Sequence, residues 1–78
     1  MTHLVGIGGI GMSAIARLLL ARGENVTGSD LKVTPLIQKL RNEGAIINIG
    51  HRAENVDGAT RVIVSSAIDK ANPEVARA

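Results

Sequence analysis

The apolar positions of the chain fall into short runs separated by stretches in which apolar residues recur at helical spacing. Residues 3–7 are almost continuously apolar, which is typical of a strand that is covered on both faces. The predicted strands are residues 3–7, 25–28, 45–49 and 61–65. Because helical stretches alternate with these strands, the pattern predicts an α/β domain.

The first predicted helix covers residues 10–22, with Ile15, Leu18 and Leu19 on its buried face and Gly23 as its C-terminal stop. The second begins at Thr34, a capping residue that is followed by proline at the first helical position. Its buried and terminal positions are Leu36, Ile37, Leu40 and Gly44.

Residues 50–61 are polar, with one helical turn predicted near Glu54, and residues 72–74 read as the start of a further helix. That last helix is too short to cover a sheet face, so we expect the chain to be an N-terminal piece of something longer. The expected fold is one Rossmann-like domain over residues 1–78, with a parallel sheet in the order 3-2-1-4. Ligands of such sheets bind outside the carboxyl ends of the strands, beside strand one.

Four glycines lie between the first strand and the first helix, at residues 6, 8, 9 and 11. Gly6, Gly8 and Gly11 match G-x-G-x-x-G. We expect the first to allow a tight turn, the second to let a diphosphate approach the backbone, and the third to let the helix pack close to the sheet. Free amides and the helix dipole at this turn attract negative oxygens, which favours nucleotide binding over a turn that binds nothing.

Further candidates follow the other strands. Asp30 ends the second strand, where it could accept hydrogen bonds from ribose hydroxyls or form an Asx turn. His51 follows the third strand and could contact ligand or simply be solvated. Ser65 and Ser66 follow the fourth and could bond a phosphate or sugar, or cap the loop backbone.

Two other polar residues have simpler interpretations. Ser13 lies in the first helical turn and could contact phosphate or bond the helix end, whereas His3 opens the first strand and is expected to be structural. We find no metal-ligand spacing, no nucleophile with a base, and no G-x-x-x-x-G-K-[ST] loop for the triphosphate of ATP. The chain therefore reads as a binding domain without catalytic residues.

Composition removes several classes of function. The chain has no cysteine and no aromatic residue, its nine Lys and Arg residues are scattered, and its net charge is +2. Without stacking platforms or a basic stripe, nucleic-acid binding is not expected. No apolar stretch approaches the roughly 20 residues of a membrane span, and no signal peptide is present, so we expect a cytoplasmic protein without a membrane partner.

The run from residue 3 to residue 13, HLVGIGGIGMS, closely resembles the start of the Mur ligases of bacterial peptidoglycan synthesis. The doubled glycine followed by Met12 and Ser13 is more specific than G-x-G-x-x-G alone. Three further segments agree in order and rough spacing, at residues 28–30, 50–56 and 64–68.

The resemblance implies an N-terminal domain that holds the UDP part of a UDP-sugar substrate. It also implies two further domains elsewhere in the protein, one that binds ATP and one that receives the amino acid. The complete enzyme would join L-alanine to the lactyl carboxylate of UDP-N-acetylmuramate, using ATP and Mg²⁺ through an acyl phosphate. This piece alone would be inactive and would bind no cofactor itself.

Residue by residue, the resemblance implies that the glycine turn holds the diphosphate and that Asp30 and Leu31 lie against the uridine. His51, Ser65 and Ser66 would line the same pocket. The implied UDP-binding residues are Gly8, Gly9, Ile10, Gly11, Met12, Ser13, Asp30, Leu31, His51, Ser65 and Ser66.

The glycine turn itself leaves two other interpretations open. The front half of an NAD-dependent dehydrogenase would also fit the glycines and Asp30, and so would a nucleotide-sensing module without catalytic activity. All three place a diphosphate on a helix N-terminus.

Overall fold

A computed structural model of the chain describes residues 1–65, 68 and 70–77. In chain order the elements are β1 (Thr2–Val5), α1 (Ile10–Ala21), β2 (Val26–Asp30), α2 (Pro35–Asn42), β3 (Ile46–Ile49), the 3-10 helix η1 (Ala53–Val56), β4 (Arg61–Val64) and α3 (Pro73–Arg77). Each predicted strand and helix is present, with ends that differ by one or two residues.

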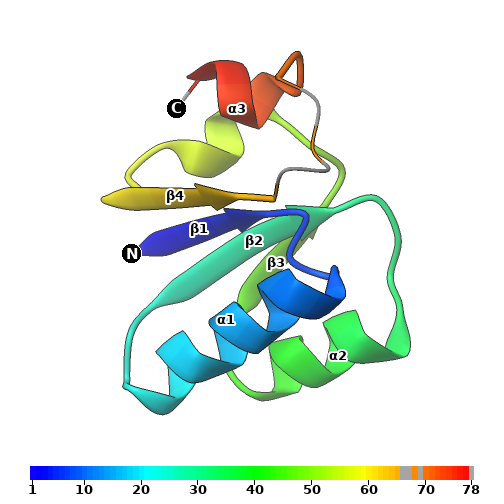
Figure 1. Cartoon of the computed structure of the whole chain (residues 1–78), viewed down its shortest axis with the longest axis vertical. Coiled ribbons are helices and arrows are strands. Elements are labelled where there is room, and N and C mark those ends of the chain that lie inside the picture. The colour runs from blue at the N-terminus through cyan, green and yellow to red at the C-terminus, as the bar shows by residue number, and fades with distance from the viewer. Residues whose placement is uncertain (66–67, 69, 78) are drawn as a thin grey trace.

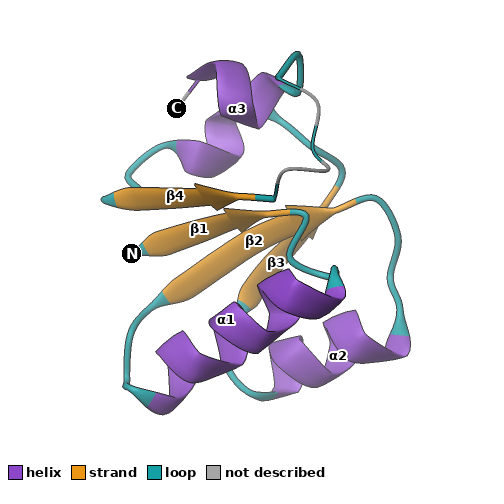
Figure 2. Ribbon diagram, in the orientation of Figure 1, coloured by secondary structure: helices purple, strands orange, loops and turns teal. Residues whose placement is uncertain are grey.

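The four strands form one sheet in the order β3-β2-β1-β4, and every pair is parallel, which confirms the predicted fold class and strand order. Helices α1 and α2 cover one face of the sheet, while η1 and α3 lie over the other (Figures 1 and 2). Because all strands point the same way, their carboxyl ends meet at one edge.

The main core lies between the sheet and the two longer helices. Leu4 and Ile7 from the β1 segment and Ile37 and Leu40 from α2 are fully buried there, together with Ala16 of α1. The core is therefore entirely aliphatic, as the lack of aromatic residues requires.

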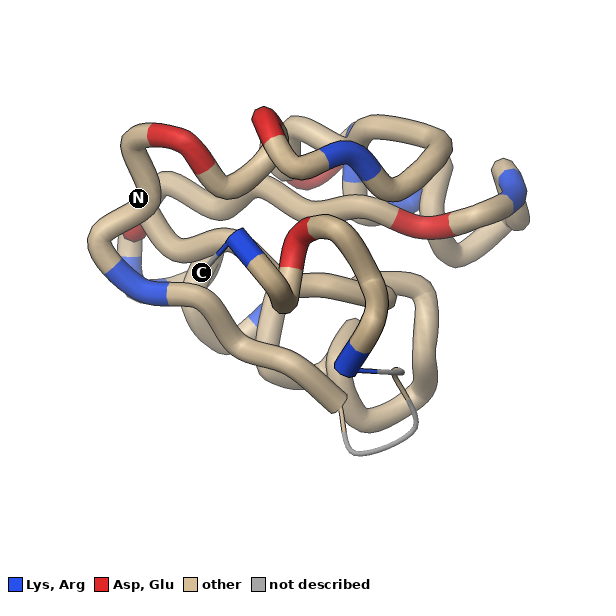
Figure 3. Tube along the Cα trace, turned by 90° about the horizontal axis from the view of Figure 1, so that it is seen from above, with Lys and Arg blue, Asp and Glu red and all other residues tan. Residues whose placement is uncertain are grey.

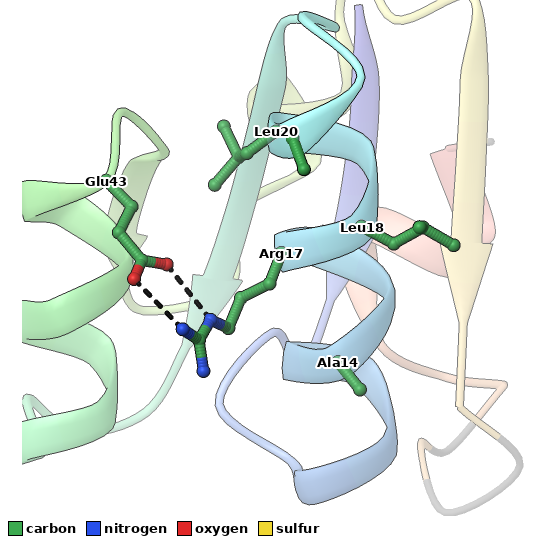
Figure 4. A pocket seen from close by; sticks show the side chains of 6 residues that line it. Ala14, Arg17, Leu18, Leu20 and Glu43 are labelled. Carbon is green, nitrogen blue, oxygen red and sulfur yellow. Dashed lines mark hydrogen bonds and ion pairs between the residues drawn. The ribbon is translucent and has the colours of Figure 1, made fainter.

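The structure corrects the predicted buried face of α1. Leu19 is buried as expected, but Leu18 is 59% exposed and Ile15 is 38% exposed. The buried positions of α1 are Met12, Ser13, Ala16 and Leu19. Since α1 is apolar on most sides, its periodicity does not select one face, and contact with the sheet and α2 makes the choice. Leu18 points from α1 toward β4 (Figure 4).

The residues predicted to begin and stop the helices are confirmed at two positions. The Thr34 hydroxyl accepts from the Ile37 N–H at 3.1 Å, and Pro35 occupies the first turn of α2. Gly23 follows α1 with φ +79, a left-handed conformation that glycine adopts without strain.

Charged residues are interspersed along the fold (Figure 3). Within the described part of the chain, arginines form exposed ion pairs between segments distant in sequence: Arg17 with Glu43, Arg61 with Glu24, and Arg77 with Asp57. All three pairs are solvent-exposed, so each contributes at most about 1 kcal/mol to stability.

Candidate functional site

The chain turns sharply after β1 at the glycines. Gly6 has φ +78, which only glycine adopts readily, and its N–H and that of Ile7 both donate to the Ser29 carbonyl, at 2.9 and 3.1 Å. The Gly9 N–H then donates back to the Gly6 carbonyl at 3.1 Å. The tight turn expected of Gly6 is therefore present, and it is tied to β2.

Asp30, at the carboxyl end of β2, is bonded to this turn. Its Oδ2 accepts from the Gly8 N–H at 2.7 Å and its Oδ1 from the Leu31 N–H at 2.7 Å. A Cβ on Gly8 would lie 2.6 Å from Asp30 Oδ2 and 3.0 Å from Ile37 Cδ1. Gly8 is therefore needed inside the protein as well, because any side chain there would collide with Asp30 and Ile37.

The first turn of α1 presents open backbone amides. Gly9 is the N-cap, no side chain caps the helix, and the Ser13 N–H is already bonded to the Gly9 carbonyl at 2.7 Å. The N–H groups of Ile10, Gly11 and Met12 therefore have no acceptor within the described residues. These three amides and the positive end of the helix dipole attract an anion.

The expectation that Gly11 lets α1 pack close to the sheet is wrong. A Cβ at Gly11 would meet nothing within 4 Å, so this glycine faces open space instead of the sheet. Ser13 is turned inward, because it is 6% exposed and its hydroxyl donates to the Ile10 carbonyl at 2.8 Å.

A hollow of about 560 Å³ opens at the carboxyl edge between the first turn of α1 and the end of β4. It is lined by Gly6, Gly9, Ile10, Gly11, Met12, Ile15, Asp30, Ile63, Val64, Ser65 and Ile68. The structure therefore brings several predicted site residues together. The hollow also has an apolar wall from Ile63 and Ile68 that the sequence did not indicate.

A second hollow, of about 410 Å³, shares Gly9 and Asp30 with the first. Its other lining residues are Gly8, Leu31, Lys32 and Thr34. Leu31 is 68% exposed and offers an apolar surface beside the Asp30 carboxylate. Ser66 lies outside the described residues.

A third hollow, of about 640 Å³, lies along α1 away from the strand ends. Arg17 donates to both carboxylate oxygens of Glu43 across it, at 3.1 and 3.3 Å (Figure 4). Because its charged groups already satisfy each other, we assign it no ligand.

On the opposite face of the sheet, the carboxylate of Glu74 is fully buried. Its Oε1 accepts from His3 Nε2 at 2.6 Å and Ser29 Oγ at 2.7 Å. Its Oε2 accepts from the Arg52 N–H at 2.9 Å and Asn55 Nδ2 at 2.8 Å. The sequence marked Glu74 only as part of a helix start. No local signal showed its burial, since its partners lie 19 to 71 positions away.

Burial by itself would raise the pKa of Glu74, but hydrogen bonds from its neighbours, led by Ser29 and Asn55, lower its pKa from 4.5 to about 2. The carboxylate is therefore ionised over the physiological range, and it fixes α3 to β1, β2 and η1.

His51 belongs to this buried group and lines neither hollow at the glycine turn. Its Nδ1 lies 2.8 Å from Ser29 Oγ and 3.3 Å from Glu74 Oε2. His3 is fully buried and bonded to Thr27 Oγ1 at 2.7 Å as well as to Glu74, which agrees with its expected structural role.

Two kinds of feature are absent from the described residues. No group of three or more His, Cys, Asp or Glu side chains is arranged to hold a metal ion there. None of the helices in that part of the chain has the length and apolar character that crossing a bilayer requires.

A family model described as "Mur ligase family, catalytic domain" matches residues 1–78. The chain is 58% identical over 76 residues to a UDP-N-acetylmuramate–L-alanine ligase of Koribacter versatilis, in an alignment that covers 97% of this chain and 16% of that protein.

Solved structures agree with this similarity. The UDP-N-acetylmuramate–alanine ligase MurC of Thermotoga maritima superposes with a TM-score of 0.91 at 41% identity, over 97% of this chain and 18% of that one. A murein peptide ligase of Psychrobacter arcticus gives a TM-score of 0.86 at 30% identity, over 96% of this chain and 16% of that one. The chain thus spans about a sixth of the length of these proteins.

Proposed function

The chain belongs to the Mur ligase family, and on that premise we propose that it binds the UDP part of UDP-N-acetylmuramate within a longer ligase that adds L-alanine. The names of its relatives support the choice of substrate and amino acid. The observation that carries the proposal is the set of open amides at Ile10, Gly11 and Met12, on a hollow at the carboxyl edge of the sheet.

In this proposal the diphosphate binds at the first turn of α1. The three amides donate to its oxygens, and the helix dipole adds a favourable interaction with the negative charge. Gly11 keeps the approach clear, because no side chain projects from it into the hollow. The amides of Gly8 and Gly9 are bonded within the protein and shape the turn instead of contacting the ligand.

The uridine lies in the second hollow, against Leu31 and beside Asp30. Asp30 acts mainly through the turn, since both of its oxygens accept from backbone amides. Ser65 provides a hydroxyl at the end of β4, and we assign a second hydroxyl to Ser66, the next residue in the sequence. His51 approaches from the other face of the same edge.

The chain's own residues bind and orient the substrate, and the reaction takes place elsewhere in the ligase. No phosphate-binding G-x-x-x-x-G-K-[ST] loop occurs in the sequence, and the described residues offer no cluster for a metal ion. We therefore assign ATP, Mg²⁺ and the incoming L-alanine to the further domains of the ligase. When bound there, ATP would supply the phosphoryl group that converts the substrate carboxylate to an acyl phosphate, with ADP as the leaving group.

Calorimetric titration with UDP and with NAD tests the proposal. UDP is expected to bind more tightly, and tighter binding of NAD would favour the dehydrogenase interpretation and overturn the proposed one. The same titration on two matched variants of α1 locates the ligand.

Gly11→Val adds a side chain at a residue that lines the hollow, and its Cβ meets nothing within 4 Å. We expect this variant to weaken UDP binding at least about tenfold, the equivalent of one lost hydrogen bond. Ala14→Val makes a similar change at an exposed position outside both hollows at the strand ends and is the control. Unchanged affinity in folded Gly11→Val would show that the diphosphate binds elsewhere.

A further inference from the structure

Glu74 lines neither hollow of the proposed UDP site, yet it is a fully buried charge with an unusually complete set of hydrogen bonds. A buried carboxylate costs several kcal/mol unless its oxygens are satisfied. One of its contacts leads through Ser29 to His51, which the family resemblance places in the substrate pocket. These hydrogen bonds therefore link the buried Glu74 carboxylate to His51, a candidate substrate-binding residue.

The hydrogen bonds of Ser29 determine where His51 carries its proton. An ionised carboxylate only accepts, so the Ser29 hydroxyl donates its single proton to Glu74 Oε1, 2.7 Å away. Ser29 Oγ also lies 2.8 Å from His51 Nδ1 and, having no second proton to donate, must accept from it. The neutral ring of His51 is thus protonated on Nδ1, and its Nε2 is left as an acceptor.

That Nε2 atom is accessible near the carboxyl edge. The residue before His51 is held to β2, because the Gly50 N–H donates to the Asp30 carbonyl at 2.7 Å. Among the described residues the His51 bonds all involve Nδ1, while no buried side-chain nitrogen or oxygen lacks a partner. Nε2 must therefore reach solvent, in a side chain that is 12% exposed.

We propose that Glu74 is a positioning residue that, through Ser29, keeps the neutral His51 ring protonated on Nδ1, so that Nε2 accepts a hydrogen bond from an O–H or N–H group of the substrate. This inference rests on the proposed function, because it takes the nucleotide as the ligand at this edge. It excludes a neutral His51 as a donor to the diphosphate.

His3 has the opposite arrangement. Its Nε2 donates to Glu74 Oε1 at 2.6 Å, and its Nδ1 accepts from the Thr27 hydroxyl at 2.7 Å. The only two histidines of the chain are therefore expected to be opposite tautomers when neutral.

Glu74→Gln keeps the shape of the side chain and reverses this arrangement. The Arg52 N–H can only donate, so the amide oxygen stays against it and the NH₂ group replaces Oε1. This NH₂ donates to Ser29 and to His3 Nε2, the Ser29 hydroxyl then donates to His51 Nδ1, and both histidines change tautomer. Because each of these groups keeps a hydrogen bond, the variant is expected to fold.

Nitrogen-15 NMR of the labelled imidazoles at mildly alkaline pH distinguishes the tautomers. In the wild type we expect the neutral His51 ring to be protonated on Nδ1 and the neutral His3 ring on Nε2. In Glu74→Gln we expect the opposite nitrogen of each ring to be protonated. Glu54→Gln makes the same chemical change at an exposed position of η1 and should leave both unchanged. A wild-type His51 protonated on Nε2 overturns the inference, and this result does not depend on any variant folding.

Titration with UDP tests the substrate part. Glu74→Gln is expected to bind UDP about tenfold more weakly, because the His51 Nε2–H group then faces a hydrogen-bond donor of the ligand. Glu54→Gln is expected to bind UDP as tightly as the wild type does. Equal or tighter binding by Glu74→Gln rules out the acceptor role. A wild-type chain that binds no UDP refutes the proposed function, and the NMR spectra still decide whether Glu74 controls the tautomer.

Discussion

The stability of the domain should depend on the ionisation of one buried carboxylate as the solution is acidified. The pKa of Glu74 lies at about 2 in the folded chain, against 4.5 when it is freely solvated. Because the folded pKa is the lower one, this stabilisation is fully present above pH 4.5 and is lost as the pH falls toward 2.

The size of this effect follows from the two pKa values. Their difference, 4.5 minus 2, is 2.5 units, which at about 1.4 kcal/mol per unit corresponds to about 3–4 kcal/mol. A domain of this length has a total free energy of unfolding of roughly 4–12 kcal/mol. Loss of the Glu74 contribution is therefore a large fraction of the total.

Urea unfolding at a series of pH values measures this contribution. Far-ultraviolet circular dichroism is the suitable signal, since the chain has no Trp, Tyr or Phe. The difference in free energy of unfolding between wild type and Glu74→Gln should shift by up to about 3–4 kcal/mol, in favour of the variant, as the pH falls through this window. Glu54→Gln, changed at an exposed position, should follow the wild type. Parallel curves for wild type and Glu74→Gln would refute the reasoning.

Two further pairs of substitutions test the glycine turn and the buried face of α1 by the same unfolding measurement. Gly8→Ala should lower the free energy of unfolding by about 1–3 kcal/mol, because its Cβ displaces the Asp30 carboxylate. Gly11→Ala should leave the free energy of unfolding unchanged or raise it. Equal losses of stability in the two variants would contradict the placement of Asp30. Leu19→Ala should cost about 2–5 kcal/mol as a core truncation, and Leu18→Ala less than about 1 kcal/mol because that side chain is 59% exposed. Similar costs of about 2–5 kcal/mol for both truncations would support the original assignment, in which both side chains are buried.

The elements and their order could be predicted because their signals are local. A nearly continuous apolar run predicted β1, and Thr34 with Pro35 predicted the start of α2, where the hydroxyl indeed caps the helix. Alternation of strands and helices then leaves few topologies, because crossovers between parallel strands are right-handed. The observed order β3-β2-β1-β4 is the expected one.

Local patterns did not determine which atoms meet across the fold. The motif marked Gly8 and Gly11 correctly as glycines of the turn, but their surroundings depend on Asp30, Ile37 and the open side of α1. The buried face of α1 was ambiguous for a related reason: Ile15, Leu18 and Leu19 are all apolar, and only packing separates them.

The sequence by itself determined that this chain is a parallel α/β domain with a glycine turn at the start of α1, since strand and helix periods and turn chemistry act over a few residues. Only the tertiary structure decided that Asp30 accepts a hydrogen bond from the Gly8 N–H and that Glu74 is hydrogen-bonded to His3, 71 positions away in the sequence. Such contacts depend on how the finished elements pack, and a buried carboxylate can exist only where that packing supplies its hydrogen bonds.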